Sequence, residues 1–215
     1  MPTLGRRITL IHAMRSSLDP IERAFAELWP EATCRSILDD ALAKDLVSKG
    51  HIDSQLTARF CSLGRYAMLD QPQAILFSCS AFGPCIDAVR EDLAPVPVRK
   101  PTDALLFELE KTGGRVGLVA WFAPTLASLM PECPPNVVFV PIFVEGAAAA
   151  HAVGDWVSHD RLVVEAALSV NVDTFALAQF SIARAAPALT ARTSKRVITS
   201  PDCAVLELKH ALTHA

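Results

Sequence analysis

A cysteine between two serines, Ser78-Cys79-Ser80, is the segment of this chain whose residue types are best suited to chemistry. It follows a short apolar run over 74–77, and Gly83-Pro84 then begins an amphipathic stretch. That order is typical of a buried strand, a tight turn and the start of a helix. The pattern predicts a Cys79 thiol at the carboxyl end of a strand, under the positive end of the next helix, which would lower its pKa toward neutrality. Ligands of open α/β sheets bind at this edge, so Cys79 is a candidate acid–base or nucleophilic group.

The elements that would position Cys79 alternate along the whole chain. Apolar runs predict strands over 8–12, 33–38, 74–79, 96–99, 115–120, 137–143, 174–179 and 197–199. Helical patterns lie between them over 19–29, 54–69, 84–92, 102–112, 124–130, 159–169, 181–186 and 201–212. Strands separated by helices imply parallel sheets with right-handed crossovers, so the expected class is α/β, doubly wound (Rossmann-like).

A faint internal repeat suggests two similar lobes. The run 74–81 and the run 174–181 each end a strand with a polar or reactive residue and then enter a helix. Three prolines over 95–101 mark a boundary between them. We therefore expect a first lobe over 1–97, joined by 198–215, and a second lobe over 98–197, with a cleft between the two.

Composition narrows the possible partners and compartment. Half of the 215 residues (51%) are hydrophobic, enough for a substantial core, and the net charge is only −3, with no basic cluster for nucleic acid. No window is apolar enough to span a bilayer, and no signal segment precedes the first strand. The six cysteines are widely spaced, without metal-binding spacing, which indicates reduced thiols. These features predict a cytoplasmic protein.

The order of elements and two short motifs resemble the aspartate/glutamate racemase superfamily, which includes hydantoin racemases, maleate isomerase and arylmalonate decarboxylase. Ser78-Cys79-Ser80-Ala81 is similar to the first-lobe cysteine motif of that family, and the run over 115–125 is similar to the strand and threonine turn that open its second lobe. The resemblance implies two lobes with an active site between them and cofactor-independent proton transfer by cysteine.

One position departs from the family pattern. The second cysteine of the family usually follows a strand, and the corresponding run here, 177–180, has Gln179 in that place. An amide cannot titrate, so Gln179 can orient a ligand but cannot exchange the second proton of a racemisation. Trp121 stands where the family often has threonine, which suggests a narrower or more apolar pocket.

Racemisation needs acid–base groups on both faces of a planar intermediate. Three residues could replace the missing thiol: His12 after the first strand, Cys203 after the last, and Glu145 after the strand over 137–143. An imidazole titrates near neutrality, which favours His12, whereas a cysteine in a first helical turn often simply packs.

Supporting groups come from both lobes. Ser78, Ser80 and the amides of Ser80 and Ala81 could bind an anion above Cys79. The opposite lobe could supply Thr125, Gln179 and Ser181, although the hydroxyls could equally cap the helices that follow them.

These observations predict an isomerase, a racemase or epimerase acting on a small carboxylate through Cys79. A one-cysteine decarboxylase or cis–trans isomerase is an alternative, as is a non-catalytic protein that binds small anions. The expected partners are the small carboxylate substrate and, in a homodimer, a second copy of the chain. No cofactor, metal, nucleic acid or membrane is expected.

Overall fold

A computed structural model describes residues 6–213, which form two four-stranded, wholly parallel sheets. The first sheet has the order β2-β1-β3-β4 and the second the order β6-β5-β7-β8. The strands are β1 (Arg7–His12), β2 (Thr33–Leu38), β3 (Ala74–Phe77), β4 (Val98–Arg99), β5 (Arg115–Ala120), β6 (Val138–Phe143), β7 (Thr174–Leu177) and β8 (Arg196–Thr199). The predicted α/β fold with two similar doubly wound lobes is confirmed.

Helices connect the parallel strands, as their crossovers require. They are α1 (Leu18–Leu28), α2 (Leu42–Lys49), α3 (Ser54–Ala67), α4 (Gly83–Asp92), α5 (Asp103–Thr112), α6 (Ala123–Leu129), α7 (Ala147–Ala152), α8 (Trp156–Leu168), α9 (Ala186–Thr190) and α10 (Ser200–Thr213). Short 3-10 turns precede several of them, including η1 (Arg15–Ser17), η3 (Ser80–Phe82) and η5 (Phe180–Ala185).

The sequence patterns omitted α2, α7 and nearly all of α9, and they predicted the 3-10 turn η5 as a helix. Helix α7 is a run of alanines without apolar periodicity, and α2 is short, so neither gave a pattern. The segment predicted as a helix over 181–186 is mostly the 3-10 turn η5, which then leads into α9.

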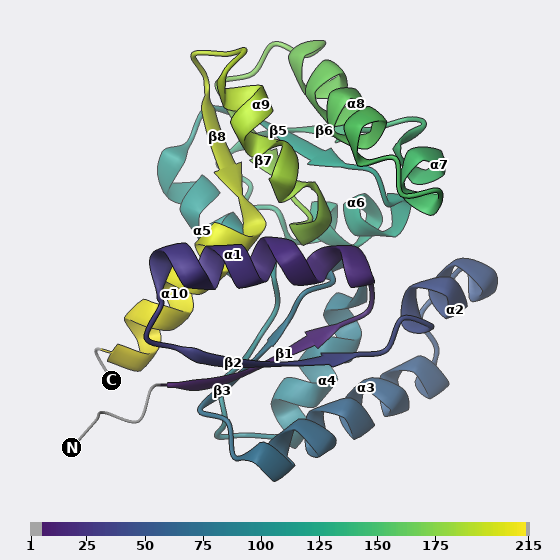
Figure 1. The fold of residues 1–215 in the computed structure, drawn as a ribbon, viewed down its shortest axis with the longest axis vertical. Coiled ribbons are helices and arrows are strands. Elements are labelled where there is room, and N and C mark those ends of the chain that lie inside the picture. The colour runs from purple at the N-terminus through teal and green to yellow at the C-terminus, as the bar shows by residue number, and fades with distance from the viewer. Residues whose placement is uncertain (1–5, 214–215) are drawn as a thin grey trace.

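The two faces of the first sheet pack against different layers. Ile8, Leu10 and Leu76 point toward α1 and α10, whereas Ile11 and Phe77 join a larger core with α3 and α4. Figure 1 shows α3 and α4 on the outer side of this sheet, with α1 and α10 running between the two lobes. Alternation along each strand therefore decides which layer a side chain meets.

The strand pairing shows to which sheet the strands near the predicted lobe boundaries belong. The short strand β4 pairs with β3, so Val98 and Arg99 belong to the first sheet although they follow residue 97. Strand β8 pairs with β7 in the second sheet. Helix α10, which follows β8, packs Ala204, Val205 and Leu208 into the core beneath the first sheet. The division into 1–97 with 198–215 and 98–197 stays a prediction.

Over residues 6–213, no helix is both long and apolar enough to cross a membrane. The six cysteines all lie in this range and none forms a disulfide.

Candidate active site between the lobes

Cys79 lies two residues after the end of β3, in extended conformation, and the turn η3 begins at the next residue. The thiol is 8% exposed, and its sulfur interacts with the backbone N–H of Ala81. Burial raises the pKa of Cys79 to about 11, and the Ala81 hydrogen bond opposes this only in part. The expectation of a lowered pKa is wrong, because desolvation of the thiolate outweighs the helix and its amides. At neutral pH Cys79 is a thiol, a proton donor rather than a base.

His12 lies at the end of β1, fully buried, with both ring nitrogens near serine hydroxyls. Nδ1 is 2.9 Å from Ser78 Oγ, and Nε2 is 3.3 Å from Ser36 Oγ. Burial lowers the pKa of His12 to about 4, so the imidazole is neutral at pH 7. A neutral imidazole has one donor and one acceptor nitrogen, and the two hydroxyls can complement either tautomer.

Strand alternation places the His12 and Cys79 side chains in different layers. Ile11 lies opposite Phe77 in the parallel register of β1 and β3, so His12 comes beside Ser78. Cys79, one residue further, packs with Phe77 in the core on the other face. The structure thus joins His12 to Ser78, and among the described residues no hydrogen bond links it to Cys79. A role for His12 in proton transfer stays a prediction.

A buried chain of hydrogen bonds crosses from the first lobe to the second. Ser80 Oγ donates to Thr125 Oγ1 at 3.2 Å, and Gln179 Nε2 donates to the same oxygen at 3.1 Å. Gln179 Oε1 accepts the backbone N–H groups of Trp121 at 2.8 Å and Phe122 at 3.3 Å. The Trp121 indole donates to Ser181 Oγ at 3.0 Å. Four predicted binding residues (Ser80, Thr125, Gln179 and Ser181) therefore meet in one network.

Gln179 has an architectural function in this network. Its carbonyl oxygen accepts hydrogen bonds from the first two backbone N–H groups after β5. Its amide nitrogen donates to the Thr125 hydroxyl in the first turn of α6. A carboxamide can do both at once, whereas a thiol offers one weak donor and a weak acceptor. Gln179 thus fixes the wall of the second lobe.

Trp121 brings two histidines to the site that sequence patterns did not indicate. His151 stacks on its indole with ring centroids 4.5 Å apart, and His159 meets it edge-on at 5.9 Å. His159 Nδ1 lies 3.1 Å from Asp160 Oδ1, while the Nε2 atoms of His151 and His159 are buried without a hydrogen-bond partner in the described residues. Burial, and secondarily His159, lower the pKa of His151. Both follow Trp121 by thirty residues or more, so no local signal could have associated them with it.

Cys203 and Glu145, the other two candidates for a second acid–base group, lie in surroundings different from those of Cys79. Cys203 packs in the apolar cluster of α5 and β5, and burial together with Glu108 raises its pKa to about 12. Glu145 is exposed in the loop before α7. Among the described residues, no hydrogen bond joins either of them to Cys79.

A largely apolar cavity of about 790 Å³ opens beside the Cys79 loop, between the lobes. The first lobe contributes Val47, Ile52 and Ala81, and the second contributes Trp121 and Phe122. The predicted binding residue Ala81 is therefore a cavity wall, two positions after Cys79. The volume is in the range typical of small-molecule sites.

No protein-family model and no curated protein matches the chain, but solved structures do. Allantoin racemase from Klebsiella pneumoniae has a TM-score of 0.73 at 15% identity, covering 97% of this chain and 88% of its own. Aspartate racemase from Picrophilus torridus scores 0.72 at 16% identity, covering 97% and 95%. Glutamate racemase from Francisella tularensis scores 0.71 at 16% identity, covering 99% and 82%.

The chain has the fold of these racemases. A maleate isomerase and an arylmalonate decarboxylase are also similar to it, so the fold accommodates racemisation, isomerisation and decarboxylation. Identities of this size establish the architecture and leave the reaction to be argued from the site.

Proposed function

We propose that the protein is a cofactor-independent isomerase-type enzyme, a racemase or epimerase, that acts on a small carboxylate with Cys79 as its proton-transfer group. The observation that carries the proposal is the position of Cys79. It lies two residues after the internal strand β3; Ser80, which follows it, joins the Ser80–Thr125–Gln179 network, and Ala81 lines the apolar cavity. Enzymes that share the fold interconvert or decarboxylate small acids, as their names state.

The site also favours the alternative reaction, a decarboxylation or isomerisation in which one cysteine acts on one face of the substrate. Gln179 cannot titrate, and Cys79 is a protonated thiol, so within residues 6–213 the site offers one proton donor and no opposing base hydrogen-bonded to it. In a decarboxylation the C–C bond breaks, CO₂ leaves, and the electron pair stays on the α-carbon as an enediolate. The Cys79 S–H then protonates that carbon, and water restores the thiol. Racemisation would need a second group, for which His12 and Cys203 remain the proposed residues.

Solvent-deuterium incorporation tests this proposal directly. Aspartate, glutamate, maleate, allantoin and phenylmalonate are incubated with the protein in D₂O and followed by proton NMR. We expect exchange, isomerisation or decarboxylation with at least one acid, abolished by Cys79→Ser and retained by Cys61→Ser, a matched change on the outer helix α3. If Cys203→Ser keeps full racemisation, Cys203 is not the second base.

The alternative is a protein that binds small anions on this scaffold without converting them. The burial of the protonated Cys79 thiol favours it. Calorimetric binding of an acid that shows neither exchange nor turnover would support this alternative and overturn the enzymatic proposal.

A further inference from the structure

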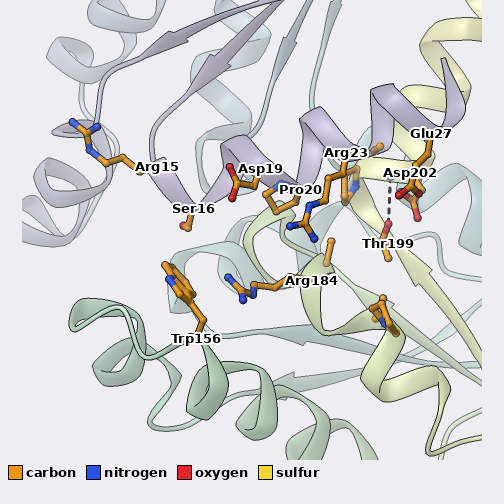
Figure 2. A pocket seen from close by; sticks show the side chains of 15 residues that line it. Arg15, Ser16, Asp19, Pro20, Arg23, Glu27, Trp156, Arg184, Thr199 and Asp202 are labelled. Atoms are coloured by element: carbon orange, nitrogen blue, oxygen red, sulfur yellow. Dashed lines mark hydrogen bonds between the residues drawn. The ribbon is translucent and has the colours of Figure 1, made fainter. Parts of the chain in front are cut away.

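A second cavity, of about 360 Å³, lies between the lobes on the side of α1 and α10. Figure 2 shows its lining: Asp19 and Arg23 reach down from α1, and Arg184 and Trp156 face them from the second lobe. The apolar cavity beside Cys79 has an entirely different lining, so the two cavities are separate sites.

Guanidinium groups from both lobes have hydrogen-bonding capacity left at this cavity. Arg23 forms no salt bridge with any residue of the described chain. Among the described residues, Arg184 bonds through its Nε alone, 2.8 Å from Asp160 Oδ2, and its guanidinium lies over the Trp156 ring at 4.8 Å. Its orientation is therefore fixed, while the terminal N–H groups stay available for a carboxylate.

Negative groups without an ion pair face the same space. Asp19, Glu27 and Asp202 line the cavity, and none has a salt-bridge partner in residues 6–213. The Ser16 hydroxyl also lines it, with a buried oxygen that lacks a hydrogen-bond partner in the same range. Because buried polar atoms are normally hydrogen-bonded, this oxygen indicates that a polar group of a ligand binds beside it.

We propose that this cavity binds a small zwitterion of the α-amino-acid class between the lobes. The ligand's carboxylate bridges Arg23 and Arg184, and its ammonium group is held by Asp19 and the Ser16 hydroxyl. A simple anion would be attracted by the guanidinium groups but repelled by the carboxylates of the lining. A simple cation would be attracted by the carboxylates but repelled by the guanidinium groups. Only a molecule that carries both charges is complementary to the lining.

Calorimetric titration with L-alanine and its two halves, propionate and ethylamine, tests the proposal. We expect L-alanine to bind at least tenfold more tightly than either half. Arg23→Gln and Arg184→Gln should each weaken alanine binding at least tenfold, and Arg161→Gln, on the outer surface of α8, should leave it unchanged. Arg23 is exposed and forms no salt bridge within residues 6–213, so its replacement should leave the fold intact.

Four results would overturn the proposal: no saturable binding of alanine, propionate binding as tightly as alanine, an equal loss in Arg161→Gln, or loss of binding in Cys79→Ser but not in Arg23→Gln. Cys79→Ser should retain alanine binding, because Cys79 does not line this cavity. Binding lost with Cys79→Ser and kept with Arg23→Gln would place the ligand at the Cys79 site instead. The failure of this inference is thus distinguishable from failure of the proposed activity, which is read from deuterium incorporation.

Discussion

Gln179 Oε1 accepts the backbone N–H of Trp121 at 2.8 Å, and this bond ties the end of β7 to the end of β5. Gln179→Ala would leave two buried N–H groups, those of Trp121 and Phe122, without an acceptor. We expect a loss of about 2 to 4 kcal/mol in unfolding free energy, measured by urea denaturation. Gln73→Ala, which removes an exposed acceptor for one backbone N–H, should cost less than about 1 kcal/mol. Equal losses in the two variants would contradict the architectural role of Gln179.

Thr125 is the junction of the inter-lobe network, since Ser80 and Gln179 both donate to its hydroxyl. Thr125→Val should destabilise the protein by about 1 to 3 kcal/mol, because two buried donors lose their acceptor. Adding Ser80→Ala removes one of these donors, so the double variant should be more stable than the sum of the single effects predicts. Additive losses in a double-mutant cycle would show that the network is not coupled.

The Cys79 thiol should react slowly with alkylating reagents. A pKa of about 11, against an ordinary value of 9.0, means roughly 100-fold less thiolate at neutral pH. Mass spectrometry of the Cys79 peptide should show iodoacetamide labelling at least that much slower in the native protein than in urea. The rate should rise about tenfold per pH unit up to pH 9. A plateau near pH 7 would mean that the thiolate is stabilised in the native site.

His12 should make the fold sensitive to acid. Its pKa falls from 6.5 to about 4 on folding, so below pH 6.5 the unfolded chain binds a proton that the folded chain does not. The unfolding free energy is therefore not reduced by His12 above pH 6.5, and it declines by up to about 3 kcal/mol as the pH falls to 4. His12→Gln should flatten this decline in denaturation curves recorded from pH 7 to 4. His51→Gln, at an exposed loop position, should retain it.

Gly64 allows α3 and α4 to pack closely. A Cβ at this position would lie 2.6 Å from Val89 Cγ1 and 3.1 Å from Leu93 Cδ1. Gly64→Ala should lower the unfolding free energy by about 1 to 3 kcal/mol, although alanine favours a helix. In a Val89→Ala background the same change should be neutral or stabilising, because the closer clash, with Val89 Cγ1, is gone, Leu93 Cδ1 is the end of a flexible side chain, and helix propensity remains. A loss of the same size in both backgrounds would rule out the steric explanation.

The local elements were predictable because their signals are local. All eight strands and most helices follow from apolar runs and turn residues, and the strand–turn–helix order around Cys79 follows from Gly83-Pro84. Helix α7 was not predictable, since a run of alanines has no periodicity. Their places after strands allowed the sequence to indicate four binding residues: Ser80, Thr125, Gln179 and Ser181. Their hydrogen-bond partners could not be predicted in the same way.

The sequence alone determined a doubly wound α/β protein with one cysteine at a strand end and glutamine at the matching place a hundred residues later. Only the tertiary structure decided what these residues do, because pKa values and hydrogen bonds depend on neighbours distant in sequence. Burial makes Cys79 a protonated thiol, although the helix start that follows it suggested a thiolate. The parallel register of β1 and β3 puts His12 beside Ser78, and alternation of side chains turns Cys79 to the other face. The pairing of β5 with β7 brings Gln179 to the Trp121 backbone N–H, so Gln179 supports the wall of the second lobe.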